Sequence, residues 1–103
     1  MDEDFETLSV RREGEHVLVV ELNRPEVYNA LNTQMAYELL TLWNGMYVDA
    51  EDVRCNVLTG SGDKAFCAGG DLKERNGMTA QAWQRQHALF EQMSRAMQQC
   101  PVP

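Results

Sequence analysis

Hydrophobic and polar positions along the chain predict a β-hairpin at its start. Residues 6–12 and 16–22 have strand patterns, and Glu13-Gly14-Glu15 between them is typical of a turn. The second strand contains Val17-Leu18-Val19-Val20, and such a continuous apolar run indicates a strand buried on both faces. Pro25 ends this strand because proline cannot donate to a ladder, and a loop to Asn32 follows.

The next apolar residues repeat at helical spacing. We expect a helix that begins at a cap on Asn32 or Thr33 and continues to about Asp49. Its core-facing stripe is predicted to comprise Met35, Leu39, Leu42 and Met46, widened by Trp43 and Tyr47.

A third strand and a second long helix follow. Residues 54–59 have a strand pattern, residues 60–63 are typical turn residues, and residues 64–72 form a small-residue loop that enters a short helical turn. Thr79 is predicted to cap a last helix to about Gln99, which Pro101 ends. The apolar face of this helix is expected to comprise Trp83, Phe90, Met93 and Met97.

The order of these elements predicts a layered α/β fold. A strand–helix–strand unit favours two parallel strands joined by a right-handed crossover. Three strands leave an open sheet edge, and Pro101-Val102-Pro103 stands where we expect another strand. We therefore expect an interrupted sheet rather than a finished one.

Composition and charge restrict the class of protein. Apolar residues make up 44% and charged residues 24% of 103 residues, which indicates a globular domain or part of one. The net charge of -7 argues against a nucleic-acid surface, and no apolar run approaches the ~20 residues of a membrane helix. The acidic start Met1-Asp2-Glu3-Asp4 resembles neither a secretory nor a mitochondrial leader, so we expect a cytoplasmic protein.

Reactive side chains give little sign of chemistry. Cys55, Cys67 and Cys100 are odd in number and form no CxxC pair, so neither a disulfide framework nor a metal site is expected. Cys67 is more simply interpreted as a small buried hydrophobic residue than as a nucleophile. His16 and His87 are most simply structural or solvated.

The most informative segment for chemistry is Ala68-Gly69-Gly70, directly before Asp71. Small residues let backbone N–H groups approach a ligand, and a helix start adds further donors, so this loop is suited to an oxyanion. On composition alone an ordinary turn is the simpler interpretation. Asp71 is more simply a helix-start carboxylate than an acid or base. Gly60-Ser61-Gly62 lacks the spacing of nucleotide-binding loops.

Two segments together resemble the enoyl-CoA hydratase/isomerase, or crotonase, family. Residues 22–32, LNRPEVYNALN, resemble that family's LNRP…NAL(N/D) signature. Residues 57–60 with 64–72, VLTG and KAFCAGGDL, resemble its VLTG…AFxAGxDL signature. The resemblance extends from about Phe5 to Pro103, and the pair of motifs in this order and spacing makes it specific.

The resemblance implies a fold, a ligand and a set of site residues. The fold is a crotonase-like spiral of ββα units, incomplete here with N-terminal units only, and the ligand is an acyl-CoA thioester. Coenzyme A enters as part of that substrate, with no covalent cofactor and no metal. By resemblance, the Gly70 N–H is one of two oxyanion donors, and Arg24 or Lys73 meets a CoA phosphate or is merely solvated. The thioester pocket then includes Ala68, Gly69, Gly70, Asp71 and Leu72, and the segment near CoA includes Val27, Asn29 and Ala30.

In the family, the second oxyanion donor and the catalytic carboxylates follow the next strand, beyond Pro103. Residues 1–103 are therefore expected to be the N-terminal part of a crotonase-like domain, truncated before both. General acid–base groups contribute about 10²–10⁴-fold to a rate, so we expect the isolated chain to lack hydratase activity. Hydration of crotonyl-CoA by the pure chain would contradict this.

Two functions remain open from the sequence. The chain is either the acyl-CoA-binding segment of an enzyme, commonly a trimer or hexamer in this family, or a non-catalytic truncated homologue that acts as a binding or assembly module. RNA binding is disfavoured because residues 33–49 contain no Lys or Arg. The acyl chain and the reaction are left open, since fold does not decide chemistry.

Overall fold

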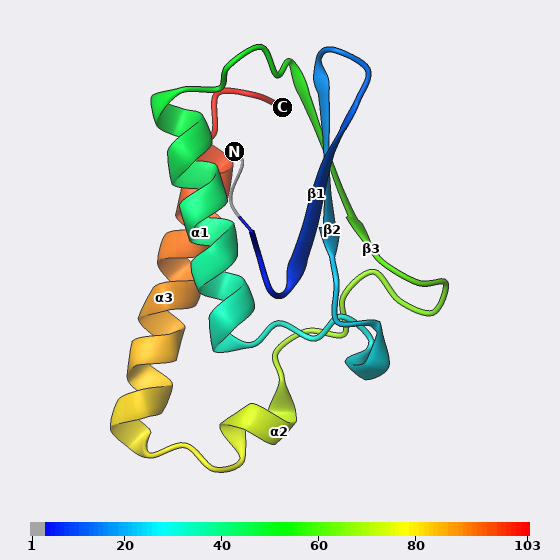
Figure 1. Cartoon of the computed structure of the whole chain (residues 1–103). Helices are drawn as coiled ribbons and strands as arrows, with labels where there is room; N and C mark the ends of the chain where they lie inside the picture. Colours follow the sequence, from blue (N-terminus) through cyan, green and yellow to red (C-terminus); the bar gives the residue numbers. More distant parts are fainter. Residues whose placement is uncertain (1–3) are drawn as a thin grey trace.

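A computed structural model describes residues 4–103. Met1-Asp2-Glu3, part of the acidic start on which the expected compartment rests, lies outside the described residues. Figure 1 shows two layers, a sheet on one side and the long helices α1 and α3 side by side on the other.

The sheet has three strands in the order β1-β2-β3. β1 (Leu8–Glu13) pairs antiparallel with β2 (Val17–Leu22), and β3 (Cys55–Gly60) pairs parallel with β2. The predicted hairpin and the parallel strand–helix–strand unit are therefore confirmed, with boundaries shifted by one or two residues. Gly14 has a φ of +70° in the hairpin turn, where glycine is the residue that fits without strain.

β2 is buried on both faces, as its apolar run predicts. Leu18 and Val20 point toward the helices and are 2% and 0% exposed. Val19 alternates to the opposite face and is 5% exposed, although it belongs to no part of the helix-facing core. In the register Val19 lies between Arg11 of β1 and Val57 of β3, whose side chains flank it on this face.

α1 (Thr33–Val48) begins as predicted, and Asn32 is the cap. The Asn32 side chain accepts a hydrogen bond from the Met35 N–H at 2.9 Å. The expected core stripe is buried, Trp43 included, but Tyr47 is 63% exposed and the prediction that it widens the stripe is wrong. Tyr47 lies one turn after Trp43 on the same side of α1, but in the last turn of the helix, where the described residues leave it uncovered.

Glu38 fastens the chain before β1 onto α1. Its carboxylate accepts hydrogen bonds from the Thr7 N–H at 2.9 Å, the Thr7 hydroxyl at 2.7 Å, the Glu6 N–H at 3.0 Å and the Gln34 amide at 2.8 Å. Burial alone would raise the pKa of Glu38, but these hydrogen bonds outweigh it and hold the pKa below its ordinary value. A buried carboxylate is thus stabilised in its charged form.

α3 (Ala80–Gln99) has the predicted cap but a different buried face. The Thr79 hydroxyl accepts from the Ala82 N–H, as expected. Trp83 and Met97 are 47% and 41% exposed, so of the predicted apolar face only Met93 is buried. The buried residues are Gln86, Leu89, Met93 and Ala96, which alternate by three and four positions.

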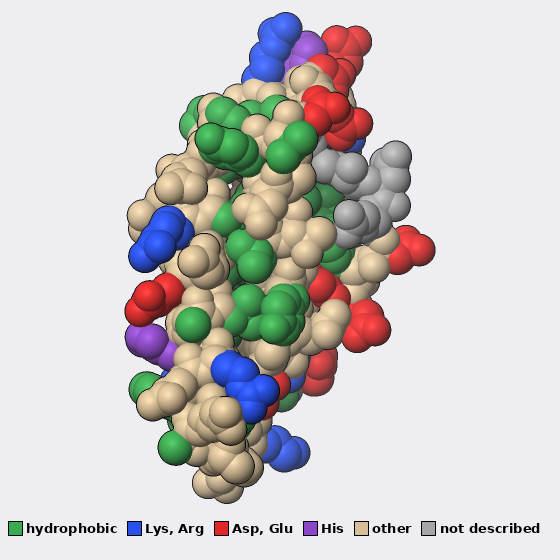
Figure 2. Space-filling model, turned by 90° about the vertical axis from the view of Figure 1, so that its left-hand side faces the viewer, with side chains coloured by type: hydrophobic (Ala, Val, Ile, Leu, Met, Phe, Trp, Pro, Cys, Tyr) green, Lys and Arg blue, Asp and Glu red, His purple; other side chains and the backbone are tan. Residues whose placement is uncertain are grey.

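The spacing explains the difference in α3. Trp83, Phe90 and Met97 lie seven residues apart, so they follow one margin of the stripe that packs against α1. The stripe itself comprises Gln86, Leu89, Met93 and Ala96, and it is the part of α3 that α1 covers. Exposed hydrophobic side chains therefore remain on the helical face, which Figure 2 views directly. Among the described residues, no helix combines the length and hydropathy needed to cross a bilayer.

Two short helices and the last residues complete the fold. η1 (Pro25–Val27) is a single 3-10 turn in the loop predicted after β2, and α2 (Leu72–Arg75) is the short helical turn predicted after the glycine loop. The chain returns after α3 to the sheet, where the Pro103 carbonyl accepts from the Asn56 N–H of β3 at 2.7 Å. The loops after β2 and after β3, together with Leu72 at the start of α2, contain every predicted site residue.

Candidate functional site

The loops that follow β2 and β3 meet at one edge of the sheet. The two strands are parallel, so their carboxyl ends lie together, and Leu22 pairs with Gly60 in the register. The Ser61 N–H donates to the Leu22 carbonyl at 2.8 Å, and the Ala68 N–H donates to the Tyr28 carbonyl at 3.0 Å. Both signature segments are thereby joined into one structure.

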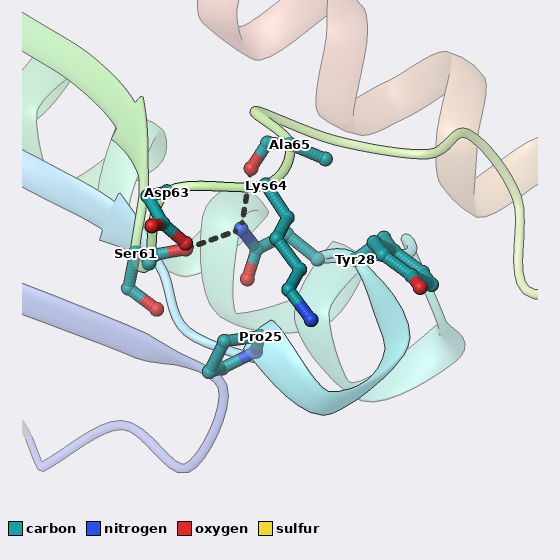
Figure 3. Close-up of a pocket in the computed structure, with 8 residues that line it drawn as sticks. Pro25, Tyr28, Ser61, Asp63, Lys64 and Ala65 are labelled. Atoms are coloured by element: carbon teal, nitrogen blue, oxygen red, sulfur yellow. Dashed lines mark hydrogen bonds between the residues drawn. The ribbon is translucent and has the colours of Figure 1, made fainter.

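Asn29 is the side chain that fixes this junction. It is 1% exposed and has a φ of +57°, a left-handed conformation that asparagine tolerates better than most residues. Its side-chain oxygen accepts from the Arg24 N–H at 2.9 Å, and its side-chain nitrogen donates to the carbonyls of Ser61 at 3.0 Å and Ala65 at 2.9 Å. Figure 3 shows the last two bonds. Asn29 therefore holds the loops in place and leaves little of its amide for a ligand.

Gly60 lies so close to the junction that no side chain fits there. A Cβ on Gly60 would stand 2.7 Å from both the Ala65 carbonyl oxygen and the Asn29 side-chain nitrogen, and would also touch the Phe66 carbonyl oxygen. Two of these three atoms belong to the backbone, which has little freedom to move. The glycine after the Val57-Leu58-Thr59 run is thus required by close approach.

The glycine loop runs alongside the segment after η1 as one parallel bridge. Leu31 pairs with Gly70, its N–H donating to the Gly69 carbonyl at 2.8 Å and its carbonyl accepting from the Asp71 N–H at 2.9 Å. In such a bridge the central residue, Gly70, directs its own N–H away from the partner. Within residues 4–103 the Gly70 N–H has no hydrogen-bond partner. A single backbone donor is therefore presented on a fixed loop.

The other predicted pocket residues surround this bridge. Ala68 and Gly69 are exposed, Leu72 is 76% exposed, and Val27 is half-buried. Ala30 is buried, and its carbonyl accepts from the Arg24 guanidinium at 2.6 Å. The structure brings residues 68–72 beside residues 28–31, as the two signatures together suggest.

Arg24 and Asp71 form an ion pair between the two loops. The Arg24 guanidinium donates to the Asp71 carboxylate at 2.9 Å, and their side chains are 17% and 13% exposed. The interpretation of Arg24 as a solvated surface charge is therefore wrong. The Asp71 carboxylate also caps α2 through the Glu74 N–H at 3.1 Å, which confirms the simpler interpretation of this residue. The Glu74 N–H and then Arg24 hold the pKa of Asp71 below its ordinary value.

This ion pair predicts a loss of stability in acid. A carboxyl whose folded-state pKa is lowered contributes stability above its unfolded-state pKa, and that contribution disappears as the pH falls through the folded-state pKa. Urea unfolding of the natural polypeptide should therefore show the stability difference between wild type and Asp71→Asn shrinking as the pH falls from neutral to below about 3. The pKa of Glu38 is also lowered, so Glu38 contributes to acid destabilisation in the same direction. Because Glu38 is present in both proteins, the difference between wild type and Asp71→Asn isolates the contribution of Asp71. A difference independent of pH would contradict the assignment.

A pocket of about 220 Å³ lies on the outer side of the Asn29 junction. Its lining comprises Pro25, Tyr28, Asn29, Ser61, Gly62, Asp63, Lys64 and Ala65. Figure 3 shows the Lys64 side chain directed into the space between Pro25 and Tyr28. Lys64 was not among the predicted site residues, although the sequence holds only two lysines and this one lies within the second signature. Lys73, the other lysine, is exposed.

A polar network around the buried Gln86 side chain attaches α2 to both long helices. The Glu74 carboxylate accepts from the Thr33 hydroxyl at 3.1 Å and from the Gln86 amide at 2.7 Å, and Gln86 is 4% exposed. The Gln86 side-chain oxygen accepts from the Arg75 Nε at 3.1 Å. Sequence reasoning missed this network because its members lie far apart in the chain and have no common motif.

The remaining reactive side chains have structural surroundings. Cys67 packs against the core, His16 is hydrogen-bonded to the Asp52 carbonyl at 2.8 Å, and His87 stacks on Trp83 and lies 2.9 Å from Glu91. Among residues 4–103, no three His, Cys, Asp or Glu side chains come together in a way that would hold a metal ion. The junction of the two loops thus carries the unpaired Gly70 N–H on the glycine loop, and the pocket at Asn29 is lined by the same two loops.

Comparison with known proteins identifies the family. The family model described as enoyl-CoA hydratase/isomerase matches residues 12–103. A mevalonyl-coenzyme A hydratase of Beauveria bassiana is 54% identical over 66 residues, which are 63% of this chain and 22% of that protein. A probable enoyl-CoA hydratase of Rhodobacter capsulatus is 37% identical over 92 residues, 87% of this chain and 34% of that protein.

Solved structures agree with the sequence relatives. The crystal structure of an enoyl-CoA hydratase from Bacillus anthracis superimposes with a TM-score of 0.89 at 34% identity, covering 95% of this chain and 38% of that one. The chain belongs to the enoyl-CoA hydratase/isomerase family. Its fold is the α/β crotonase fold over the N-terminal portion, and it spans 22% to 38% of the length of these three relatives.

Proposed function

We propose that this chain is the acyl-CoA-binding segment of an enoyl-CoA hydratase/isomerase-type enzyme, the N-terminal part of a crotonase-like domain. The Gly70 N–H donates to the thioester carbonyl oxygen and stabilises the negative charge that this oxygen gains in an enolate. One observation carries the proposal: the Gly70 N–H is directed away from the Leu31 bridge and has no partner within residues 4–103. A preorganised donor of this kind is suited to a charge that develops during reaction.

The surroundings of Gly70 support this role. The Arg24–Asp71 ion pair and the Leu31 bridge hold the loop on both sides of the donor, so little reorganisation is needed when charge appears. α2 adds little to the field at the loop, because it has only four residues and the Asp71 carboxylate already caps its first turn. The donor itself, rather than a helix terminus, supplies the stabilisation.

The CoA part of the ligand has a place beside the same junction. The pocket between Pro25–Tyr28 and Ser61–Ala65 offers the exposed ring of Tyr28 and the ammonium group of Lys64 to a nucleotide phosphate or pantetheine chain. Asn29 acts here by positioning the pocket wall. Assembly as a trimer or hexamer and a cytoplasmic location stay predictions.

Binding of a thioester compared with free CoA tests the proposal against the assembly-module alternative. The natural polypeptide that contains these residues should gain thermal stability with butyryl-CoA, by about 2.7 kcal/mol at one hundred times the dissociation constant. CoA alone should stabilise it less, because the thiol offers no carbonyl to Gly70. Lack of stabilisation by millimolar butyryl-CoA would refute the proposal and favour a binding or assembly module.

A further inference from the structure

Arg75 presents two unpaired N–H₂ groups beside the proposed oxyanion donor. A Cβ built on Gly70 would stand 2.7 Å from the central guanidinium carbon of Arg75 and 2.8 Å and 3.0 Å from its two terminal nitrogens. The open edge of the guanidinium therefore occupies the space that a side chain at position 70 would fill. Gly70 is the residue that makes this approach possible.

The guanidinium is held in this position from behind. Its Nε donates to the Gln86 side-chain oxygen at 3.1 Å, and its central carbon lies 5.6 Å from the centroid of the Phe90 ring. Gln86 is itself fixed, because its amide nitrogen donates to Glu74 at 2.7 Å and to the Thr33 hydroxyl at 3.0 Å. The side-chain oxygen of Gln86 is thereby oriented toward Arg75, and the Arg75 side chain is preorganised.

The charge of Arg75 is uncompensated within the described chain. No carboxylate in residues 4–103 lies within ion-pair distance of it, and its two terminal nitrogens have no acceptor there. The nearby carboxylates are engaged elsewhere, Asp71 by Arg24 and Glu74 by Gln86 and Thr33. A fixed cation with a free planar edge matches a carboxylate through two parallel hydrogen bonds.

We propose that Arg75 binds a carboxylate on the acyl group of the thioester, so that the substrates of this site are short acyl-CoA molecules that carry a second, free carboxyl group. The inference rests on the proposed function, since Gly70 places the thioester carbonyl. The acyl group is short because the guanidinium lies directly against Gly70, which brings the carboxylate within a few bonds of the thioester carbon. A single enolate oxygen is the less favourable partner, since it uses only one side of the planar edge.

Binding of two unreactive thioesters to the natural polypeptide tests the inference. Butyryl-CoA and glutaryl-CoA have the same chain except for a terminal carboxyl group. Wild type should bind glutaryl-CoA more tightly, and Arg75→Gln should lose about ten- to one hundredfold in affinity for glutaryl-CoA while keeping that for butyryl-CoA. Arg75→Lys should be intermediate, because an ammonium group provides charge without the planar pair of donors.

Two further variants make the result specific. Arg54→Gln removes the same charge from an exposed side chain at the opposite end of β3 and should leave both affinities unchanged. Gly70→Ala places a methyl group where the Arg75 guanidinium lies, so it should lower the preference for glutaryl-CoA with Arg75 intact. This variant tests the geometry even if Arg75→Gln fails to fold.

The outcomes separate the inference from the proposed function. Equal affinities of wild type for the two thioesters, or an equal loss of both in Arg75→Gln, would overturn the carboxylate assignment and leave the acyl-CoA site standing. Binding of neither thioester by wild type would overturn both.

Discussion

Replacing Asn29 by alanine should lower the free energy of unfolding by about 3–4 kcal/mol, a large part of the stability of a small domain. The change removes three hydrogen bonds, to Arg24, Ser61 and Ala65, and leaves their backbone groups unpaired at a position that is 1% exposed. Alanine also adopts the left-handed φ of +57° less readily than asparagine. Urea unfolding of the natural polypeptide, followed through tryptophan fluorescence, measures the loss.

Two variants identify the cause. Asn29→Gly removes the same hydrogen bonds but accepts the left-handed backbone, so it should lose about 1 kcal/mol less than Asn29→Ala. Asn44→Ala, on the exposed side of α1, should change stability by less than about 0.5 kcal/mol. A typical intramolecular hydrogen bond contributes about 1 kcal/mol. If Asn29→Ala lowers the free energy of unfolding by less than about 1 kcal/mol in total, Asn29 does not hold the junction.

Gly60→Ala should destabilise the protein by about 2–3 kcal/mol through overpacking alone. The added methyl group meets the Ala65 carbonyl oxygen and the Asn29 side chain at 2.7 Å, and neither can retreat without breaking the hydrogen bond between them. The glycine loop should move with them, so ligand affinity should fall together with stability.

Gly45→Ala provides the matched control for this substitution. Gly45 lies within α1 and has no heavy atom within 4 Å of the added Cβ, apart from its own helix and chain neighbours. Alanine there should raise stability by about 0.5–1 kcal/mol because it favours the helical backbone. Opposite signs for the two glycines, measured by the same unfolding curves, are the expected result. A neutral Gly60→Ala would show that the junction is looser than its distances indicate.

The elements of this fold were predictable because local patterns determine them. The hairpin, α1, α3 and their caps follow from apolar periodicity and from Asn32 and Thr79, and the boundaries differ by at most two residues. The buried face of α3 was not predictable in the same way. Packing against α1 buries the side of α3 that carries Met93 and Ala96 and leaves Trp83 and Met97 exposed, and the sequence of α3 alone does not contain that choice of side.

The site was predictable in location but only partly in detail. The two signatures locate the junction, yet the roles of Asn29 and Arg24 depend on contacts between residues 24–30 and residues 61–71 that no local pattern contains. The Arg75–Gln86–Glu74 network likewise joins two helices through side chains without a shared motif. The roles of these residues are therefore determined by tertiary hydrogen bonds and not by sequence spacing or composition.

Removal of the Gly70 N–H tests the central claim most directly. Replacing Gly70 by glycolic acid in the natural polypeptide converts this one amide into an ester and keeps every side chain. The control is the same change at Gly77, an exposed glycine whose N–H also has no partner within the described residues. Because the ester also weakens the Gly69 carbonyl as an acceptor for Leu31, the unfolding temperature of each variant is measured alongside.

The readout is the near-ultraviolet absorbance of bound acetoacetyl-CoA, whose enolate absorbs there while its keto form does not. Wild type and the Gly77 ester should stabilise the enolate, and the Gly70 ester should lower its equilibrium population by about 10²–10³-fold, the scale of losing one oxyanion donor. An enolate population in the Gly70 ester equal to that of wild type would contradict the account.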